Sequence, residues 1–329
     1  MLFEPVQSFQ RERDVSPDLS PLEIRASIGD FLERCGLFLQ VCPKHTEFAA
    51  ECIAESDARG YLIPQNGVFK NFIPAGVAMA RNAYAHQPHE VQMFISLYTA
   101  FLVYLDDMFE NDMDAVRQFN HKFISRKPQK LELLDHFAEL LHEMPALFGS
   151  VVANIMTTST LNLVTALSIE HEVGGVILEP SAHRFPTFSR VMSGASETYA
   201  LFMFPSDEPL RHILQALPDC MTFINNGNDI LSFYKEQLSN ETVNRVYLTA
   251  QCRGISQAVV LQELTDEAVA SHQRVIDIFR PHKRTLGAYL AFSQGYIGFH
   301  SALERYRLHE LKLEYGITSH GEGMTPRKR

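Results

Sequence analysis

Apolar residues recur at intervals of three and four along most of the chain, which is the spacing of one face of an α-helix. The first such stretch follows Ser20-Pro21-Leu22-Glu23, where a hydroxyl, a proline and a glutamate occupy positions favoured at a helix start. Pro and Gly residues separate the later stretches. The pattern predicts a helix from residue 21 and further helices over residues 44–58, 74–86, 88–108, 112–125, 129–143, 147–172, 186–203, 208–237, 240–252, 255–279 and 281–314.

The pattern gives no sign of a sheet or of an internal repeat. Runs of β-branched residues with strict alternation are absent, and nothing recurs at a solenoid period. Segments 1–19 and 316–329 are polar, and the second is basic. We therefore expect one all-α domain over residues 20–315 between two disordered ends. The apolar run 91–105 is too short to span a bilayer comfortably and is expected as a buried central helix.

Composition narrows the classes of partner and compartment. The net charge of −10, with no basic stripe, excludes a nucleic-acid partner, because phosphate backbones demand clustered positive charge. A small anionic substrate stays compatible with this charge. The five cysteines show no zinc or redox spacing, and the first residues lack the apolar core of a signal peptide. We expect a cytoplasmic protein with no membrane partner.

Acidic residues gather where the apolar run ends. Asp106 and Glu110 are four positions apart, so they share one helix face and are spaced to bind a hard cation through oxygen. Carboxylates at the end of a buried helix are costly unless something offsets their charge. On its own, this D-D-x-x-E pattern is more typical of a solvated helix end.

A second polar group lies on one helical stripe further along the chain. Asn228, Ser232 and Glu236 follow one another at intervals of four and offer an amide, a hydroxyl and a carboxylate oxygen. Such a donor set suits Mg²⁺. Lys235 lies beside them and would meet a phosphate as a point charge. A polar stripe on a surface helix has the same pattern.

The third group lies near the end of the last predicted helix. Tyr296 belongs to an aromatic stripe at helical spacing that leads to Arg305 and Tyr306. This arrangement would put a cationic phosphate contact at the rim of an aromatic-lined cavity. Core packing and a surface ion-pair cluster are the simpler alternatives.

Taken together and in this order, the three groups resemble the trichodiene synthase family of fungal class I terpene cyclases. The matching strings are YLDDMFE at 104–110, NDILSFYKE at 228–236 and RYRL at 305–308. The resemblance implies a class I terpenoid synthase helical bundle with a central active-site cavity. It also implies ionisation of a prenyl diphosphate, farnesyl diphosphate by default with geranyl diphosphate open, to a sesquiterpene or terpene alcohol plus diphosphate, and a homodimer.

The resemblance further implies a site with three Mg²⁺ ions. The implied metal ligands are Asp106, Glu110, Glu170, Asn228, Ser232 and Glu236. The implied diphosphate contacts are Arg190, Lys235, Arg305 and Tyr306. Arg190 is assigned as the diphosphate sensor from the segment FSRVMSG, with Arg184 as the fallback.

Aromatic residues are expected along the cavity, where ring faces stabilise a carbocation. Helical phase relative to the motifs suggests Tyr98, Phe101 and Tyr296, and Phe72 lies beside the proline at the start of a predicted helix. Only Tyr296 also has the support of the resemblance. Core packing is the alternative for each. The chain has no tryptophan, and Phe299 stands where the family has one.

Two other functions stay open at this point. A prenyl-chain-elongating synthase would share the fold and the metals, but it normally carries two D-D-x-x-D motifs, and the N-D-x-x-S-x-x-x-E string here favours a cyclase. A catalytically silent helical binding protein would keep the fold without turnover.

Overall fold

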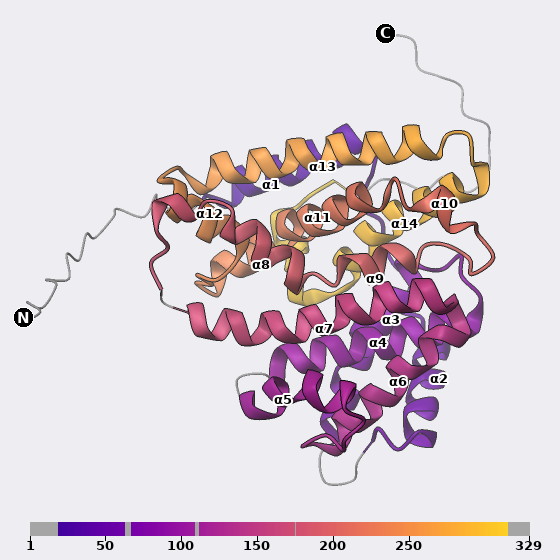
Figure 1. Cartoon of the computed structure of the whole chain (residues 1–329). Coiled ribbons are helices and arrows are strands. Elements are labelled where there is room, and N and C mark those ends of the chain that lie inside the picture. The colour runs from indigo at the N-terminus through magenta and orange to yellow at the C-terminus, as the bar shows by residue number, and fades with distance from the viewer. Residues whose placement is uncertain (1–18, 63–66, 109–111, 175, 315–329) are drawn as a thin grey trace, which may run out of the picture.

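The computed structural model describes residues 19–62, 67–108, 112–174 and 176–314. Helices dominate this part of the chain, and no strand occurs within the described ranges (Figure 1). The all-α prediction is therefore confirmed. In chain order the α-helices are α1 Pro21–Cys35, α2 Thr46–Ala58, α3 Ile73–Ala78, α4 His89–Met108, α5 Met113–Ile124, α6 Glu132–Phe148, α7 Ser150–Val173, α8 Phe185–Ser193, α9 Ser196–Leu201, α10 Leu210–Ile213, α11 Leu217–Leu238, α12 Arg245–Arg253, α13 Gln257–Phe279 and α14 Lys283–Ala302.

Local chemistry sets the start of the first helix. The Ser20 hydroxyl accepts a hydrogen bond from the Glu23 backbone N–H at 3.3 Å, and the Glu23 carboxylate accepts one from the Ser20 N–H at 2.8 Å. These two bonds satisfy backbone donors that a helix start would otherwise leave unpaired. The helix ends at Gly36, which takes the left-handed conformation that glycine tolerates without strain. The predicted start at residue 21 is confirmed.

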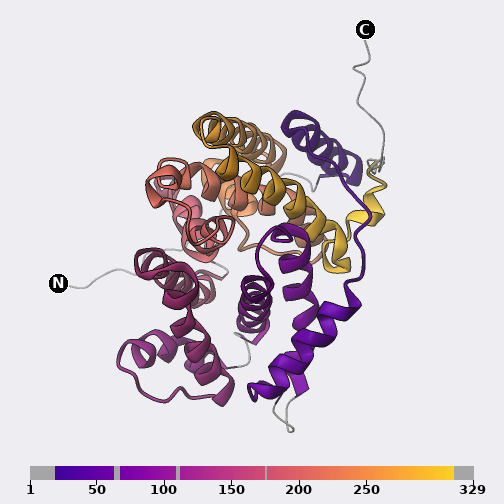
Figure 2. The same ribbon diagram turned by 90° about the vertical axis from the view of Figure 1, so that its right-hand side faces the viewer.

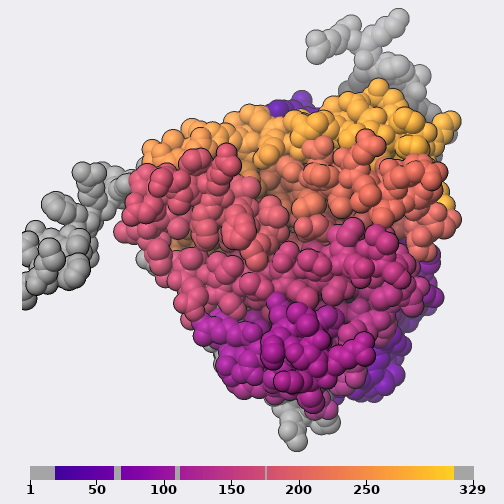
Figure 3. Space-filling model, in the orientation of Figure 1, coloured from indigo at the N-terminus to yellow at the C-terminus, as the bar shows by residue number. Residues whose placement is uncertain are grey.

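The helices surround α11, which is buried along most of its length. α11 packs against α1, α9 and α13, while α7 packs against α5, α6, α8 and α9. In Figure 1, α13 and α7 both run across the view from left to right, with α11 between them. Figure 2, turned by 90°, shows several of the long helices nearly end-on. In the space-filling view, stretches that follow one another along the chain lie next to one another on this face of the molecule (Figure 3). One hydrophobic cluster extends from Leu19 to Leu313.

α7 is long and apolar enough to cross a membrane by length and composition. In the fold it packs against four other helices, and Asn120 of the neighbouring α5 bonds to it. The Asn120 amide donates to the Leu161 carbonyl at 2.8 Å and to the Thr165 hydroxyl at 2.9 Å. α7 is thus a packed helix of the bundle.

The sequence predicted one helix over residues 186–203, and this prediction is wrong at its centre. α8 ends at Ser193 and α9 begins at Ser196, and Ala195 between them has φ of 43°. Gly194 approaches α11 so closely that a Cβ there would lie 2.1 Å from Asn225 Oδ1. The break bends the chain around α11 and leaves the last turn of α8 facing the interior.

The predicted final helix 281–314 also ends early. α14 stops at Ala302 and is followed by two short 3₁₀ turns, Glu304–Tyr306 and Leu308–Leu311. Arg307 between them has φ of 56°, which a continuous helix does not allow. The first turn packs against α11, so the chain folds back over that helix. The predicted helix 208–237 likewise divides, into α10 and α11.

The predicted helix 74–86 begins as α3 and continues as a π-helical turn, Met79–Ala83. This turn packs against α14 at Gly295. A Cβ on Gly295 would lie 2.0 Å from the Asn82 carbonyl oxygen, so only glycine permits the contact. The close approach sets the distance between the π-helical turn and α14.

The first described residue is tied to the end of α11. The Leu19 N–H donates to Gln237 Oε1 at 3.0 Å, and Gln237 Nε2 donates to the Leu19 carbonyl at 2.8 Å. Leu19 is also buried. The described part of the chain thus begins one residue before the predicted domain start at residue 20. Residues 1–18 and 316–329 lie outside the described residues.

Candidate active site

A cavity of about 280 Å³ lies between α4, α7, α8, α11 and the turns after α14. Its lining combines apolar side chains with carboxylates and cationic groups. The apolar side chains include Met79, Leu102, Leu163, Leu167, Ile224 and Phe299. On α4 and α7 they come about one turn before the carboxylates, as Leu102 does before Asp106 and Leu167 before Glu170. Such a cavity suits a molecule with an apolar body and an anionic end.

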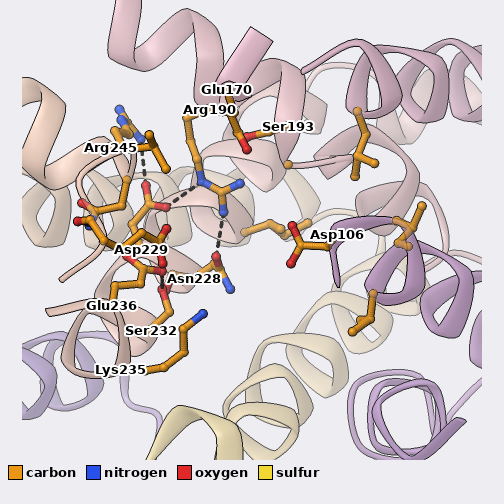
Figure 4. Close-up of a pocket in the computed structure, with 18 of the residues that line it drawn as sticks. Asp106, Glu170, Arg190, Ser193, Asn228, Asp229, Ser232, Lys235, Glu236 and Arg245 are labelled. Atoms are coloured by element: carbon orange, nitrogen blue, oxygen red, sulfur yellow. Dashed lines mark hydrogen bonds and ion pairs between the residues drawn. The ribbon is translucent and has the colours of Figure 1, made fainter. Parts of the chain in front are cut away.

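Asp106 and Glu170 supply carboxylates from two different helices, α4 and α7. In Figure 4 the Asp106 side chain points across the cavity toward the α11 wall. Asp106 keeps an exposed surface toward the cavity while protein surrounds it on the other sides, and this burial raises its pKa, opposed by the charge of Arg305. Burial, with repulsion from Asp106, raises the pKa of Glu170 to about 7.

Two more carboxylates come from the end of α11 and the turn after it. Burial, together with repulsion from Glu241, raises the pKa of Glu236. Burial likewise raises the pKa of Glu241, against the attraction of Lys235. Asp106, Glu170, Glu236 and Glu241 thus line one cavity in conditions that disfavour their charged forms. A cation among them would offset that cost.

The predicted stripe of oxygen donors faces this cavity. Asn228, Ser232 and Glu236 all line it from α11. The Ser232 hydroxyl lies 2.7 Å from the Asn228 carbonyl oxygen and 2.5 Å from Glu236 Oε1. Amide, hydroxyl and carboxylate oxygens are the ligand types that Mg²⁺ takes, so this donor set fits the predicted metal. Within the described ranges, no three His, Cys, Asp or Glu side chains are already clustered as a metal site.

Arg190 reaches the cavity from α8 and is held there by α11. Its Nε donates to Asp229 Oδ1 at 2.6 Å, and its Nη2 donates to Asn228 Oδ1 at 2.9 Å (Figure 4). The Arg245 Nη1, from α12, lies 3.4 Å from the other oxygen of Asp229. Arg184, the fallback sensor, is exposed at the start of α8 and does not line the cavity.

Three more predicted contacts for an anion surround the same cavity: Lys235, Arg305 and Tyr306. The Arg305 guanidinium lies 5.9 Å from the centre of the Tyr306 ring. Tyr306 is buried, and that burial raises the pKa of its hydroxyl to about 12. The phenol therefore stays protonated and can donate a hydrogen bond.

The predicted aromatic lining is correct only in part. Tyr296 lines the cavity, and its hydroxyl donates to the Ile224 carbonyl at 3.1 Å. Phe72, Tyr98 and Phe101 do not line it. The Tyr98 hydroxyl pairs with Thr160 Oγ1 at 2.8 Å, deep in the core. Assigning Tyr98 to the cavity was therefore wrong.

α4 faces the cavity with a different set of residues from those predicted as aromatic lining. Thr99, Leu102 and Val103 line the cavity together with Asp106. At about 100° per residue, Thr99 lies about 20° around the helix from Asp106, whereas Tyr98 lies about 80° away. Core packing, the alternative considered for Tyr98 and Phe101, is what the structure shows.

Several cavity residues were not predicted. Tyr199 on α9 donates from its hydroxyl to Thr99 Oγ1 at 3.2 Å. Asp229 and Arg245 form the buried ion pair described above, and Glu241 adds a carboxylate. Of these only Asp229 lies inside a predicted motif. The others are brought in by tertiary contacts that have no local signature.

His300 on α14 is a further unpredicted neighbour of the site. Its Nδ1 lies 2.8 Å from the Tyr296 carbonyl oxygen, and its Nε2 lies 3.2 Å from Asn228 Nδ2. Burial lowers the pKa of His300 to about 4, so the imidazole is neutral. Glu110, a predicted metal ligand, lies outside the described residues.

Comparison with known proteins gives consistent results. The profile of the trichodiene synthase family matches residues 68–320. Alpha-cuprenene synthase COP6 from Coprinopsis cinerea is 33% identical over 293 residues, covering 88% of this chain and 90% of the relative. Monoterpene synthase 25 from Postia placenta is 30% identical over 244 residues, covering 73% of each.

Solved structures extend the likeness to the fold. The linalool/nerolidol synthase from Streptomyces clavuligerus, solved in complex with 2-fluorogeranyl diphosphate, superposes with a TM-score of 0.57. The match covers 82% of this chain and 96% of that one, at 12% sequence identity. At this identity the likeness supports a shared helical architecture.

Proposed function

This chain belongs to the trichodiene synthase family and is a class I terpene synthase, and from that premise we propose that it uses Mg²⁺ to ionise farnesyl diphosphate. The observation that carries the proposal is the mixed lining of the cavity. Carboxylates and cations line it together with aliphatic and aromatic side chains, and on α4 and α7 the apolar lining residues come about one turn before the carboxylates. A prenyl diphosphate combines the same two chemistries, in its diphosphate and its hydrocarbon chain.

The proposed metal ligands are the oxygens of Asp106, Glu110, Glu170, Asn228, Ser232 and Glu236. Three Mg²⁺ ions bound there would supply Lewis-acid charge to the leaving diphosphate. The carboxylates support this assignment, because burial raises the pKa values of Asp106, Glu170 and Glu236, and repulsion from a neighbouring carboxylate adds to the rise at Glu170 and Glu236. A bound cation would relieve both effects.

Four donors would bind the diphosphate itself. Arg190, Lys235 and Arg305 carry the positive charge, and Tyr306 offers a phenolic O–H. Charge-assisted hydrogen bonds of this kind stabilise the negative charge that develops on the leaving group. Asp229 would keep Arg190 directed at the cavity, since the pair is only slightly exposed and bonds at 2.6 Å.

The apolar part of the cavity would hold the prenyl chain and protect the carbocation from water. Tyr199, Tyr296 and Phe299 line the cavity, and a cation over a desolvated ring gains on the order of 2 kcal/mol. The cavity contour then decides the product. Residues 20–315 would form the synthase domain of a cytoplasmic homodimer that acts without nucleic acid or membrane.

The test is incubation with farnesyl or geranyl diphosphate, with and without Mg²⁺, following released diphosphate and volatile products together. We expect terpene formation only with Mg²⁺ and faster with farnesyl diphosphate. The Asn228→Ala/Ser232→Ala variant should lose turnover while its circular dichroism stays unchanged. Near-wild-type turnover in that variant would remove both residues from the metal site.

Two further outcomes would point to other functions. With isopentenyl diphosphate added, formation of longer prenyl diphosphates would indicate chain elongation. Binding of the prenyl diphosphate without turnover, with or without metal, would indicate a binding protein and overturn the proposal.

A further inference from the structure

His300 lies where three parts of the candidate site meet. Its imidazole is completely buried on α14, with the Tyr296 ring 4.6 Å away and the Tyr306 ring 4.5 Å away between centroids. On its remaining side it contacts Asn228 of α11. His300 does not itself line the cavity. It therefore touches the site only through its neighbours.

The two hydrogen bonds of His300 define which nitrogen carries the proton. The Tyr296 carbonyl can only accept, so Nδ1, 2.8 Å away, is the protonated nitrogen. Nε2 then has a free lone pair, and the atom opposite it at 3.2 Å is Asn228 Nδ2, which can only donate. The imidazole thus accepts a hydrogen bond from the Asn228 amide.

This bond sets the orientation of the Asn228 amide. With Nδ2 directed at His300, the amide oxygen faces the cavity, where it accepts from Arg190 Nη2 at 2.9 Å. A half-turn of the amide would direct its NH₂ group at the Arg190 guanidinium and its oxygen at the lone pair of Nε2. Both contacts would be repulsive, so one orientation is strongly favoured.

Arg190 cannot hold this orientation through the whole reaction. In the proposed function it binds the diphosphate, and the Asn228 oxygen then bonds to a metal ion instead of to the guanidinium. The contact with His300 lies on the buried side and needs no rearrangement when a ligand enters. It is the only remaining bond to the Asn228 amide within the described part of the chain.

We propose that His300 is a positioning residue that keeps the Asn228 oxygen directed at the cavity for a divalent cation. The proposal rests on the proposed function, because it needs a cation bound by Asn228. Mutation of a residue that hydrogen-bonds to a metal ligand typically lowers metal affinity by 10–100-fold. We expect a loss in that range when His300 can no longer accept the bond.

Two substitutions separate the hydrogen bond from the packing of the ring. His300→Phe keeps an aromatic ring between Tyr296 and Tyr306 but has no acceptor. His300→Gln loses the ring but has an amide oxygen that can accept from Asn228. If the bond matters, the Phe variant loses function and the Gln variant keeps it. If ring packing matters, the order is reversed.

The measurement is calorimetric titration of Mg²⁺ into the full-length protein with inorganic diphosphate present, which needs no turnover. We expect the Phe variant to bind Mg²⁺ at least 10-fold more weakly than wild type and the Gln variant to stay within about 3-fold. The matched control is His272, another buried histidine, on α13, that bonds to the Tyr289 hydroxyl at 2.8 Å. Its Phe and Gln variants should bind Mg²⁺ as wild type does.

The outcomes separate this inference from the proposed function. Failure of the wild-type protein to bind Mg²⁺ with diphosphate would overturn the metal assignment itself. Binding by wild type together with full affinity in His300→Phe, or equal losses in the Phe and Gln variants, would overturn the role of His300 alone. If His300→Phe does not fold, His300→Leu, which is smaller and also lacks an acceptor, takes its place.

Discussion

Four carboxylates that line the cavity, those of Asp106, Glu170, Glu236 and Glu241, are held where burial disfavours their charge. Glu170 shows this most clearly, since burial and the nearby Asp106 raise its pKa to about 7. Structural carboxylates are normally paired with a cation, and their pKa values fall. The opposite shift in several residues facing one space indicates a site built for a mobile positive charge rather than for stability alone.

A pH titration of stability should reveal this. A carboxyl whose pKa is raised by folding stabilises the protein fully below the unfolded value of about 4.5, and this contribution is lost as the pH rises through the folded value. The melting temperature of the metal-free protein should therefore fall between pH 5 and pH 8. The unfolding free energy should fall over the same pH range, and in Glu170→Gln this fall should be smaller by on the order of 1–3 kcal/mol.

The control for that titration is Glu33→Gln, which changes an exposed glutamate of α1. It should reproduce the wild-type dependence on pH. A Glu170→Gln protein with the wild-type slope would show that the Glu170 carboxyl is already relieved by solvent or by another group.

Arg305 offers a second prediction for a single residue. Its guanidinium can form two parallel hydrogen bonds to a diphosphate, and a lysine cannot. Arg305→Lys should raise KM several-fold or change the product profile, checked by steady-state kinetics and gas chromatography. Arg307→Lys is the neighbouring control, because Arg307 pairs with Glu310 at the surface. Unchanged kinetics and products in Arg305→Lys would remove Arg305 from the site.

The sequence alone could identify site residues that share one helix face because of their spacing. Asn228, Ser232 and Glu236 face one cavity because a period of four keeps them on one side of a helix. Asp229, in the same motif, was passed over because its partners Arg190 and Arg245 are 39 and 16 positions away. His300 was missed for the same reason, since Asn228 lies 72 positions from it.

At the scale of elements, helix existence was easier to predict than helix ends. The start at Pro21 is fixed by local hydrogen bonds, and the sequence alone identifies it. The break between α8 and α9 depends instead on the contact of Gly194 with Asn225, which belongs to another helix. No local pattern distinguishes that glycine from one inside a helix.

The contact between α14 and the π-helical turn can be tested with one methyl group. Gly295→Ala would place a Cβ 2.0 Å from the Asn82 carbonyl, and backbone atoms cannot move aside as a flexible side chain can. We expect a loss of at least 1–3 kcal/mol, the usual cost of overpacking. The measurement is chemical denaturation followed by circular dichroism.

Gly287→Ala in the same helix is the matched control. Nothing lies within 4 Å of a Cβ at Gly287, so this alanine should stabilise α14 by up to about 1 kcal/mol. Opposite signs for the two variants would attribute the effect to the contact. Equal effects would mean that helix propensity alone decides both.

At the scale of the whole molecule, the cavity and the core are built from the same elements. α11 carries the oxygen donors on one side and packs against α1, α9 and α13 on others, and Gln237 at its end binds Leu19. The polar side of a central helix is therefore exposed to the cavity rather than to solvent. A ligand that neutralises this side should stabilise the entire bundle and not one helix.

Ligand binding at the cavity should therefore be measurable as a change in the melting temperature of the whole protein. Ligands that bind only the folded state raise its stability by about 2.7 kcal/mol at 100 times their dissociation constant. Inorganic diphosphate and Mg²⁺ together should raise the melting temperature by several degrees and by more than either alone, because the anion and the metal ions compensate each other's charge in the site. Asn228→Ala/Ser232→Ala should lose this shift, measured against the same variant without ligand. A full shift with diphosphate alone would mean that Arg190, Lys235 and Arg305 suffice to hold the anion, and the carboxylates would then need another explanation.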